Sequence, residues 1–296
     1  MNDVMQNDER VIVRLKPLVD LAKKAAFLTS RQQRIKAAQS GGYVSRFKGR
    51  GMEFDEVRLY QAGDDIRSID WRVTARTNKT HSKVFREERE RPIFISVDLR
   101  PMMNFATRGV FKSVQASKVA ALLAWSAQLN GDRVGGQVFN EQGCQELKPA
   151  SGRRAVLHLL NALVKPTLSV TEPLSLEQVL NRLTKHARPG SLLYIVSDFR
   201  GFNDKVERQL SKLARHCEIE LVHIYDPLES HLPKKGHYRF TNGERDIVID
   251  TSNNQGVLAY QQHYQQRQEQ LKTMCKKWRM SLIQCSTNDQ PIEVLS

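Results

Sequence analysis

From Ile93 onward, short apolar runs alternate with longer segments whose apolar residues recur every three or four positions. The short runs are typical of strands buried on both faces, and the longer segments are typical of helices packed on a core. The strands that this pattern predicts cover residues 93–97, 134–139, 192–196, 219–225 and 281–285. The predicted helices cover residues 112–129, 153–164, 176–187, 206–214 and 260–278. This alternation predicts an α/β fold with a mainly parallel central sheet.

The chain before residue 92 follows a different pattern. Apolar residues at helical spacing between Val11 and Ala38 predict one helix or two short ones, and a densely charged stretch then runs to Pro92. We therefore expect two parts. Residues 1–91 form a basic helix followed by a charged, irregular segment, and residues 92–296 form the α/β domain.

A β-hairpin interrupts the strand and helix alternation near the end of the chain. The Asn242-Gly243 pair lies between two short β-rich runs, 238–240 and 247–249. This dipeptide is the strongest local signal for a two-residue hairpin turn. Residues 237–250 are therefore expected to form a hairpin insertion.

Net charge adds a question about partners. The chain carries a formal charge of +14, and residues 1–50 hold 11 Lys or Arg against 4 Asp or Glu. Such an arm suits RNA, DNA, an anionic membrane or an acidic protein, although a solvated helix face is the simplest interpretation. Phe27, Tyr43 and Phe47 are too sparse to form a base-stacking platform. Nucleic-acid binding is therefore the less favoured hypothesis.

Cysteine spacing and hydropathy indicate a compartment. The four cysteines lie far apart, and none of them has the spacing of a zinc knuckle, so we expect reduced and mostly buried thiols. No apolar run approaches the length of a membrane span, and the N-terminus lacks the apolar core of a secretory signal. We expect a cytoplasmic protein.

A long ordered motif occupies residues 49–91 and continues into the α/β domain. Its most specific parts are Gly63-Asp64-Asp65-Ile66-Arg67, Asp70-Trp71, Thr74-Ala75-Arg76, Gly131-Asp132-Arg133-Val134-Gly135 and Ser197-Asp198-Phe199. Over at least residues 43–200 the chain resembles the bacterial family called domain of unknown function fifty-eight, DUF58. The resemblance implies a Rossmann-like von Willebrand factor A-type domain behind a characteristic N-terminal segment. It also implies an association with a MoxR-type AAA+ ATPase.

The A-type resemblance directs attention to the loop after the first strand of the α/β domain. In A-type domains this loop reads Asp-x-Ser-x-Ser and holds a divalent metal, together with a distant threonine and a second aspartate. Here it reads Asp98-Leu99-Arg100-Pro101-Met102, so both hydroxyl positions are lost. Asp198 matches the second aspartate, and Thr171 is a weak candidate for the threonine.

The replacements in this loop disfavour a metal. The guanidinium of Arg100 repels cations, and the thioether of Met102 is a poor ligand for hard metals. We therefore expect neither a metal nor another cofactor. Two alternatives remain for Arg100: it pairs with Asp98 and Asp198 in place of a metal, because an arginine fork matches carboxylates well, or it points to solvent.

The charged segment offers a second candidate site. Three aspartates, Asp64, Asp65 and Asp70, are interleaved with four arginines, Arg58, Arg67, Arg72 and Arg76. Clustered carboxylates serve as metal sites or acid/base pairs. Alternating cations favour instead an ion-paired network that docks the segment on the sheet, with Trp71 as a buried apolar anchor. A partner-binding surface is the alternative.

No catalytic motif is recognisable in the chain. It lacks a Walker phosphate loop, a Gly-x-Ser-x-Gly elbow and a His-Glu-x-x-His helix. We expect a non-enzymatic adaptor or co-chaperone that binds a MoxR-type AAA+ ATPase or its client through the sheet edge near Asp98, Arg100 and Asp198. The rival hypotheses are a metal-dependent hydrolase that uses the three aspartates of the charged segment, and electrostatic nucleic-acid binding through the basic N-terminus.

Overall fold

The computed structural model describes residues 9–28, 52–61, 64–87, 91–165, 174–232, 236–241, 246–251 and 254–296. Contacts divide the chain into two compact units, one of Met1–Arg31 with Arg91–Ser296 and one of Gln32–Glu90. The division at residue 91 lies where the sequence predicted it, but the first 31 residues, expected in the N-terminal part, fall in the α/β unit. The N-terminal helical segment belongs to the α/β unit.

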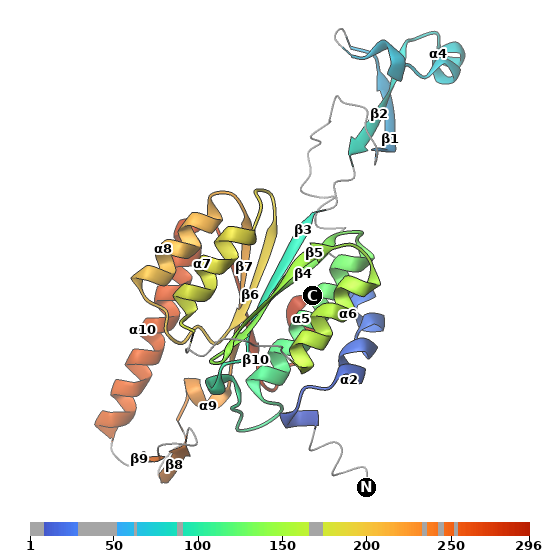
Figure 1. Ribbon diagram of the computed structural model, residues 1–296. Coiled ribbons are helices and arrows are strands. Elements are labelled where there is room, and N and C mark those ends of the chain that lie inside the picture. Colours follow the sequence, from blue (N-terminus) through green and yellow to red (C-terminus); the bar gives the residue numbers. More distant parts are fainter. Residues whose placement is uncertain are drawn as a thin grey trace. The chain divides into compact units, whose positions relative to one another are not determined.

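The α/β unit is built on a six-stranded sheet with the order β10-β7-β6-β3-β4-β5 (Figure 1). Its strands are β3 (Pro92–Asp98), β4 (Arg133–Asn140), β5 (Gly143–Ala150), β6 (Leu192–Ser197), β7 (Glu218–Tyr225) and β10 (Ser281–Ser286). Every pair is parallel except β4 with β5. The predicted α/β class with a mainly parallel sheet is confirmed. The sequence pattern missed β5, because this edge strand exposes Glu146 and Lys148 and lacks an apolar run.

Helices cover both faces of the sheet (Figure 1). One face carries α5 (Lys112–Leu129) and α6 (Arg153–Val164), with α2 (Leu15–Asp20) and α11 (Pro291–Leu295) packed on them. The other face carries α7 (Leu176–His186), α8 (Asp204–Ala214) and α10 (Asn254–Trp278). Two short helical turns, η2 (Pro101–Met103) and α9 (Pro227–Ser230), lie in the loops.

The two-sided burial follows from the alternation of side chains along each strand. Ile93, Ile95 and Val97 of β3 belong to the cluster under α5 and α6, whereas Phe94 belongs to the cluster under α7, α8 and α10. Successive side chains of a strand point to opposite faces, so a continuous apolar run supplies both cores at once.

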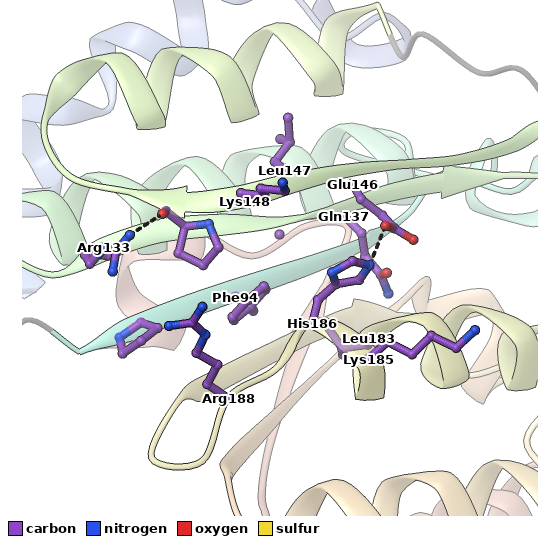
Figure 2. Close-up of a pocket in the computed structure, with 13 residues that line it drawn as sticks. Phe94, Arg133, Gln137, Glu146, Leu147, Lys148, Leu183, Lys185, His186 and Arg188 are labelled. Carbon is purple, nitrogen blue, oxygen red and sulfur yellow. Dashed lines mark hydrogen bonds and ion pairs between the residues drawn. The ribbon is translucent and has the colours of Figure 1, made fainter.

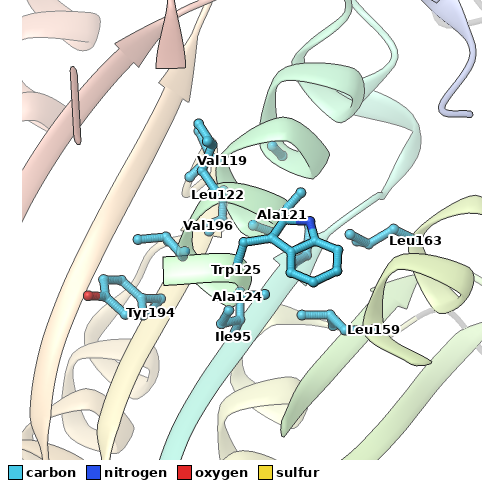
Figure 3. Close-up of a cluster of buried hydrophobic side chains, with 14 of the residues drawn as sticks. Ile95, Val119, Ala121, Leu122, Ala124, Trp125, Leu159, Leu163, Tyr194 and Val196 are labelled. Carbon is cyan, nitrogen blue, oxygen red and sulfur yellow. The ribbon is translucent and has the colours of Figure 1, made fainter. Parts of the chain in front are cut away.

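Trp125 of α5 ties the N-terminal helix to the α/β unit. Its side chain is 3% exposed and lies in the cluster that contains Ile95 and Leu159 (Figure 3). The indole Nε1 donates a hydrogen bond of 3.1 Å to the carbonyl oxygen of Leu18 in α2. Because a buried indole N–H needs an acceptor, this bond fixes where α2 lies.

The predicted hairpin forms from β8 (His237–Thr241) and β9 (Asp246–Asp250), which pair in the antiparallel sense. The turn residues Asn242 and Gly243 lie outside the described residues, as does much of the basic arm. Among the described residues, none of the helices is both long and apolar enough to cross a membrane.

The second unit is a small α+β element. Strands β1 (Met52–Leu59) and β2 (His81–Glu87) pair antiparallel, and between them lie η1 (Ile66–Ser68) and α4 (Trp71–Thr77). The amide of Asp70 donates to the carbonyl oxygen of His81 at 2.9 Å, and the amide of His81 donates to Thr74 Oγ1 at 3.0 Å. These bonds hold α4 beside β2.

The expectation that Trp71 is a buried anchor is wrong, because its side chain is 68% exposed. The half-buried residues of α4 are Val73 and Thr74, which lie two and three positions after Trp71. Trp71 is the first residue of α4, and it shares a helix face with the exposed Ala75, on the side away from Val73.

The two tryptophans give opposite expectations for stability. Trp125→Ala should lower the free energy of unfolding by roughly 3–5 kcal/mol, because it leaves a cavity and removes the bond that holds α2. Trp71→Ala is the matched control and should change it by less than about 0.5 kcal/mol, as at an exposed site. Urea denaturation of both variants measures the difference. Equal losses would show that Trp71 is buried after all.

Candidate functional site

Two aspartates from neighbouring strands meet at the carboxyl edge of the sheet. Asp98 is the last residue of β3, and Asp198 directly follows Ser197, the last residue of β6. The two strands are parallel neighbours, so their carboxyl ends lie side by side. Asp98 is 0% exposed and Asp198 is 5% exposed. Two buried carboxylates this close together require cationic or hydrogen-bonding partners.

Arg100 supplies the partner of Asp98. Its Nη2 lies 2.6 Å from Asp98 Oδ2, and its Nε donates to Asp98 Oδ1 at 3.0 Å, so the contact is a bidentate fork. Burial opposes the charge of Arg100, but the hydrogen bond and the charge of Asp98 outweigh it, and the net effect raises the pKa of Arg100. The predicted pairing is present for Asp98. The contact of Arg100 with Asp198 is long, at 4.0 Å.

The main cation beside Asp198 is a residue that the sequence pattern did not single out, Lys112. This first residue of α5 is 0% exposed, and its Nζ donates to Asp198 Oδ2 at 2.9 Å and to Glu229 Oε1 of α9 at 2.8 Å. Desolvation raises the pKa of Asp198, but the charge of Lys112 and the other partners outweigh it, so the net pKa is lowered. The sequence carries no local signal for this role, because the partners of Lys112 lie 86 and 117 positions away.

Arg200 completes the arrangement from the turn after β6. Its Nη2 donates to Glu229 Oε1 at 2.8 Å, and its amide donates to Asp198 Oδ1 at 3.0 Å. Phe199 makes this turn with a positive φ of 51° while its ring is 1% exposed. A bulky residue in the left-handed region is uncommon and costs of order 1–3 kcal/mol. The turn places Arg200 beside the carboxylates of Asp198 and Glu229.

His223 lies in the core on the next strand, β7, and adds no further positive charge near neutral pH. Burial lowers its pKa to about 4, although Asp198 and Glu229 act in the opposite direction. Its ring stacks on Tyr225 with centroids 5.6 Å apart, and among the described residues its Nδ1 has no hydrogen-bond partner.

The edge therefore carries three carboxylates and three cations. The carboxylates are Asp98, Asp198 and Glu229, and the cations are Arg100, Lys112 and Arg200. The carboxylate oxygens that face the edge accept hydrogen bonds from protein donors, Asp98 also from the hydroxyl of Ser197 at 2.6 Å. Of the remaining loop candidates, Met102 is 42% exposed, and Thr171 lies outside the described residues.

The aspartates of the charged segment serve mainly as caps. Asp65 Oδ1 accepts from the amide of Arg67 at 2.9 Å, and Asp70 Oδ1 accepts from the amides of Arg72 and Val73 at 3.0 and 3.1 Å. The backbone hydrogen bond from Val73 is the largest cause of the lowered pKa of Asp70. An N-cap carboxylate of this kind begins a helix.

The predicted ion-paired network is only partly present in this segment. Asp64 pairs with Arg58 at 2.7 Å, and Asp70 pairs with Lys83 at 3.6 Å rather than with an arginine. Arg67 and Arg76 are exposed, and among the described residues no ion pair joins either of them to a carboxylate. Gly63 lies outside the described residues. In the described part of the chain, no three His, Cys, Asp or Glu residues are grouped to hold a metal ion.

Comparison with known proteins identifies relatives without a known activity. The model of the family described as "Protein of unknown function DUF58" matches residues 56–270. An uncharacterized protein of Mycobacterium tuberculosis, Rv1480, is 27% identical over 241 residues, which is 79% of this chain and 75% of that protein. The uncharacterized protein Mb1516 of Mycobacterium bovis matches to the same extent, 27% over 241 residues.

Solved structures are similar at lower identity. An aerotolerance-related membrane protein from Bacteroides fragilis matches at 14% identity and a TM-score of 0.46, over 69% of this chain and 94% of that one. The conserved hypothetical protein BatB from Bacteroides thetaiotaomicron matches at 16% and 0.44, over 66% and 90%. A von Willebrand factor type A protein from Catenulispora acidiphila matches at 10% and 0.32, over 50% and 35%.

Removing the Lys112 ammonium should destabilise the fold. Lys112→Met leaves Asp198 and Glu229 without their shared buried cation, and such a loss costs roughly 3–5 kcal/mol. A depressed carboxyl pKa stabilises the fold above the ordinary value of 3.8, and this contribution is lost as the pH falls through the lowered pKa. In Lys112→Met the pKa of Asp198 rises, so the midpoint of acid unfolding should move up by about 1 pH unit.

Lys118→Met, on the same helix, is the control. Desolvation lowers the pKa of Lys118, and the side chain has no carboxylate of the edge as a partner. Its acid midpoint should stay that of the unmodified chain. Acid unfolding of the unmodified chain and of both variants is followed by circular dichroism. Equal unfolding midpoints for the three proteins would contradict the role of Lys112.

Proposed function

The chain belongs to the DUF58 family, and from that premise we propose that it is a non-enzymatic adaptor that binds a partner protein through the carboxyl edge of its sheet without a metal. One observation carries the proposal: the ammonium of Lys112 lies within 2.9 Å of Asp198 and 2.8 Å of Glu229. An internal cation thus takes the place where a partner-binding A-type domain would need a metal. A MoxR-type AAA+ ATPase, or its client, is the proposed partner.

The side chains that remain accessible at this edge suit a protein partner. Met102 is 42% exposed, and the Arg200 side chain is 35% exposed. Methionine and arginine are enriched in protein–protein interfaces, where arginine contributes many of the strongest contacts. Arg200 is held by Glu229 before any partner arrives, which lowers the entropy cost of binding.

The rival function of a metal-dependent hydrolase finds less support. Its three aspartates already have partners, since Asp64 pairs with Arg58 while Asp65 and Asp70 cap helical turns. Carboxylate oxygens that accept backbone amides at a helix start are engaged in those hydrogen bonds, which disfavours a role as metal ligands or general bases.

The thiols are consistent with the proposed setting. All four cysteines are free, and burial raises the pKa of Cys275 and of Cys285 to about 11. Unpaired cysteines are common in reducing compartments. The proposal therefore places the adaptor and the ATPase together in the cytosol.

The metal-free part of the proposal predicts the result of a calorimetric titration. Mg²⁺, Mn²⁺ and Ca²⁺ should produce only weak, non-stoichiometric heats, because Arg100 and Lys112 repel a cation from the carboxylates that would ligate it. Stoichiometric uptake that disappears in Asp98→Ala would contradict the proposal.

The partner part of the proposal predicts a binding defect at the edge. Full-length protein immobilised for biolayer interferometry should bind the MoxR-type AAA+ ATPase of the same genome. Met102→Glu should weaken this binding at least about tenfold, because it places a carboxylate in the contact. Leu129→Glu is the matched control, since Leu129 is 48% exposed at the opposite end of α5. No binding by the unmodified chain, or equal losses in both variants, would refute the proposed docking edge.

A further inference from the structure

A groove lies on the face of the sheet that α7 covers, near the edge strand β5. Its volume is about 530 Å³, and its apolar lining includes Phe94 of β3 and Leu183 of α7 (Figure 2). Phe94 and Leu183 are 3% and 2% exposed, so only small parts of their side chains reach the floor of the groove. Pockets of this size, apolar inside with a few polar groups at the rim, are typical binding sites.

The rim of the groove is cationic. Arg133, Lys148, Lys185 and Arg188 line it, against the single carboxylate of Glu146. Glu146 is already engaged, by His186 Nε2 at 2.6 Å and by Arg182 Nη1 at 3.6 Å. Among the described residues, no ion pair joins any of the four cations to a carboxylate, and Arg133 Nη2 donates to the carbonyl oxygen of Pro149 at 2.9 Å. Like charges around an apolar floor attract an anionic ligand.

The cations are distributed rather than convergent. Arg133 and Arg188 lie toward one end of the groove, and Lys185 lies toward the other, beyond the Glu146 and His186 pair (Figure 2). A compact anion such as phosphate requires donors that converge on one point. Carboxylates spaced along an extended chain match separated cations better, and an apolar side chain between them matches the floor.

We propose that this groove binds an acidic peptide segment of the partner protein, with carboxylates on the rim cations and an apolar side chain over Phe94 and Leu183. The inference rests on the proposed adaptor function and adds a second contact to it. The carboxyl edge of the sheet and this groove involve different residues, so each contact can be tested alone.

Fluorescence anisotropy with the full-length protein tests the groove directly. The probe is a fluorescein-labelled peptide of alternating glutamate and leucine, compared with a peptide in which glutamine replaces every glutamate. The glutamate peptide should bind, and the glutamine peptide should bind at least about tenfold more weakly. Lys148→Glu with Arg188→Glu should weaken binding of the glutamate peptide by a similar factor.

A second charge reversal controls for net charge. Lys272→Glu with Lys276→Glu changes two exposed residues of α10 and gives the same total charge as the groove variant. It should leave peptide affinity within about twofold of the unmodified chain. Equal weakening by both double variants would overturn the proposal, because the attraction would then be non-specific.

Two further outcomes would also overturn the proposal. One is equal binding of the glutamate and glutamine peptides. The other is tighter, groove-dependent binding of a labelled single-stranded oligonucleotide, which would assign the rim to phosphates. Failure of the groove is distinguishable from failure of the adaptor function, since ATPase binding that is sensitive to Met102→Glu but not to the groove variant would leave the adaptor function intact.

Discussion

The ion pair between Lys112 and Asp198 is the interaction on which the carboxyl edge of the sheet depends. Lys112 is the first residue of α5, Asp198 directly follows β6, and Glu229 belongs to α9, so one ammonium joins three elements that are distant in the sequence. An unpaired charge at 0% exposure is strongly unfavourable, and each of these groups is tolerable only with the others in place. The arrangement therefore fixes both loop positions and the orientation of Arg200 beside them.

The other contacts at this edge of the sheet depend on the ion pair between Lys112 and Asp198. With Asp198 neutralised by Lys112, Arg100 is available to Asp98, with which it forms the bidentate contact. A metal ion would compete with both side chains, and neither can leave without stranding a buried carboxylate. Arg100 and Lys112 thus hold the two aspartates of this edge with cations that belong to the chain itself.

Much of the fold was predictable from the sequence, because strands that are buried on both faces of a sheet have continuous apolar runs. The helix over Lys112–Leu129 and the strand from Leu192 were recognisable from apolar runs alone. Strand β5 was not, since an edge strand mixes polar and apolar residues. Trp71 was misjudged because a large aromatic residue inside a charged motif suggests an anchor, whereas its position at the start of α4 turns it to solvent.

The site was predictable only in part. Arg100 and Met102 were visible in the loop as residues that disfavour a metal, and pairing with the aspartates was one of two alternatives for Arg100. The structure shows the pairing with Asp98. The role of Lys112 was not visible, because it depends on a contact with a residue 86 positions away. No local pattern distinguishes a buried lysine at the start of a helix from an exposed one. The same holds for Glu229, which reaches the edge only through the packing of α9.

A double-mutant cycle between Lys112 and Asp198 tests the central claim most directly. The free energies of unfolding of Lys112→Met, Asp198→Asn and the double variant are measured in urea at neutral pH. If the two groups form the buried pair described here, the double variant loses less stability than the sum of the single losses, by about 1–3 kcal/mol. Losses that add to within about 0.5 kcal/mol would show that the two side chains do not interact, and would contradict the account.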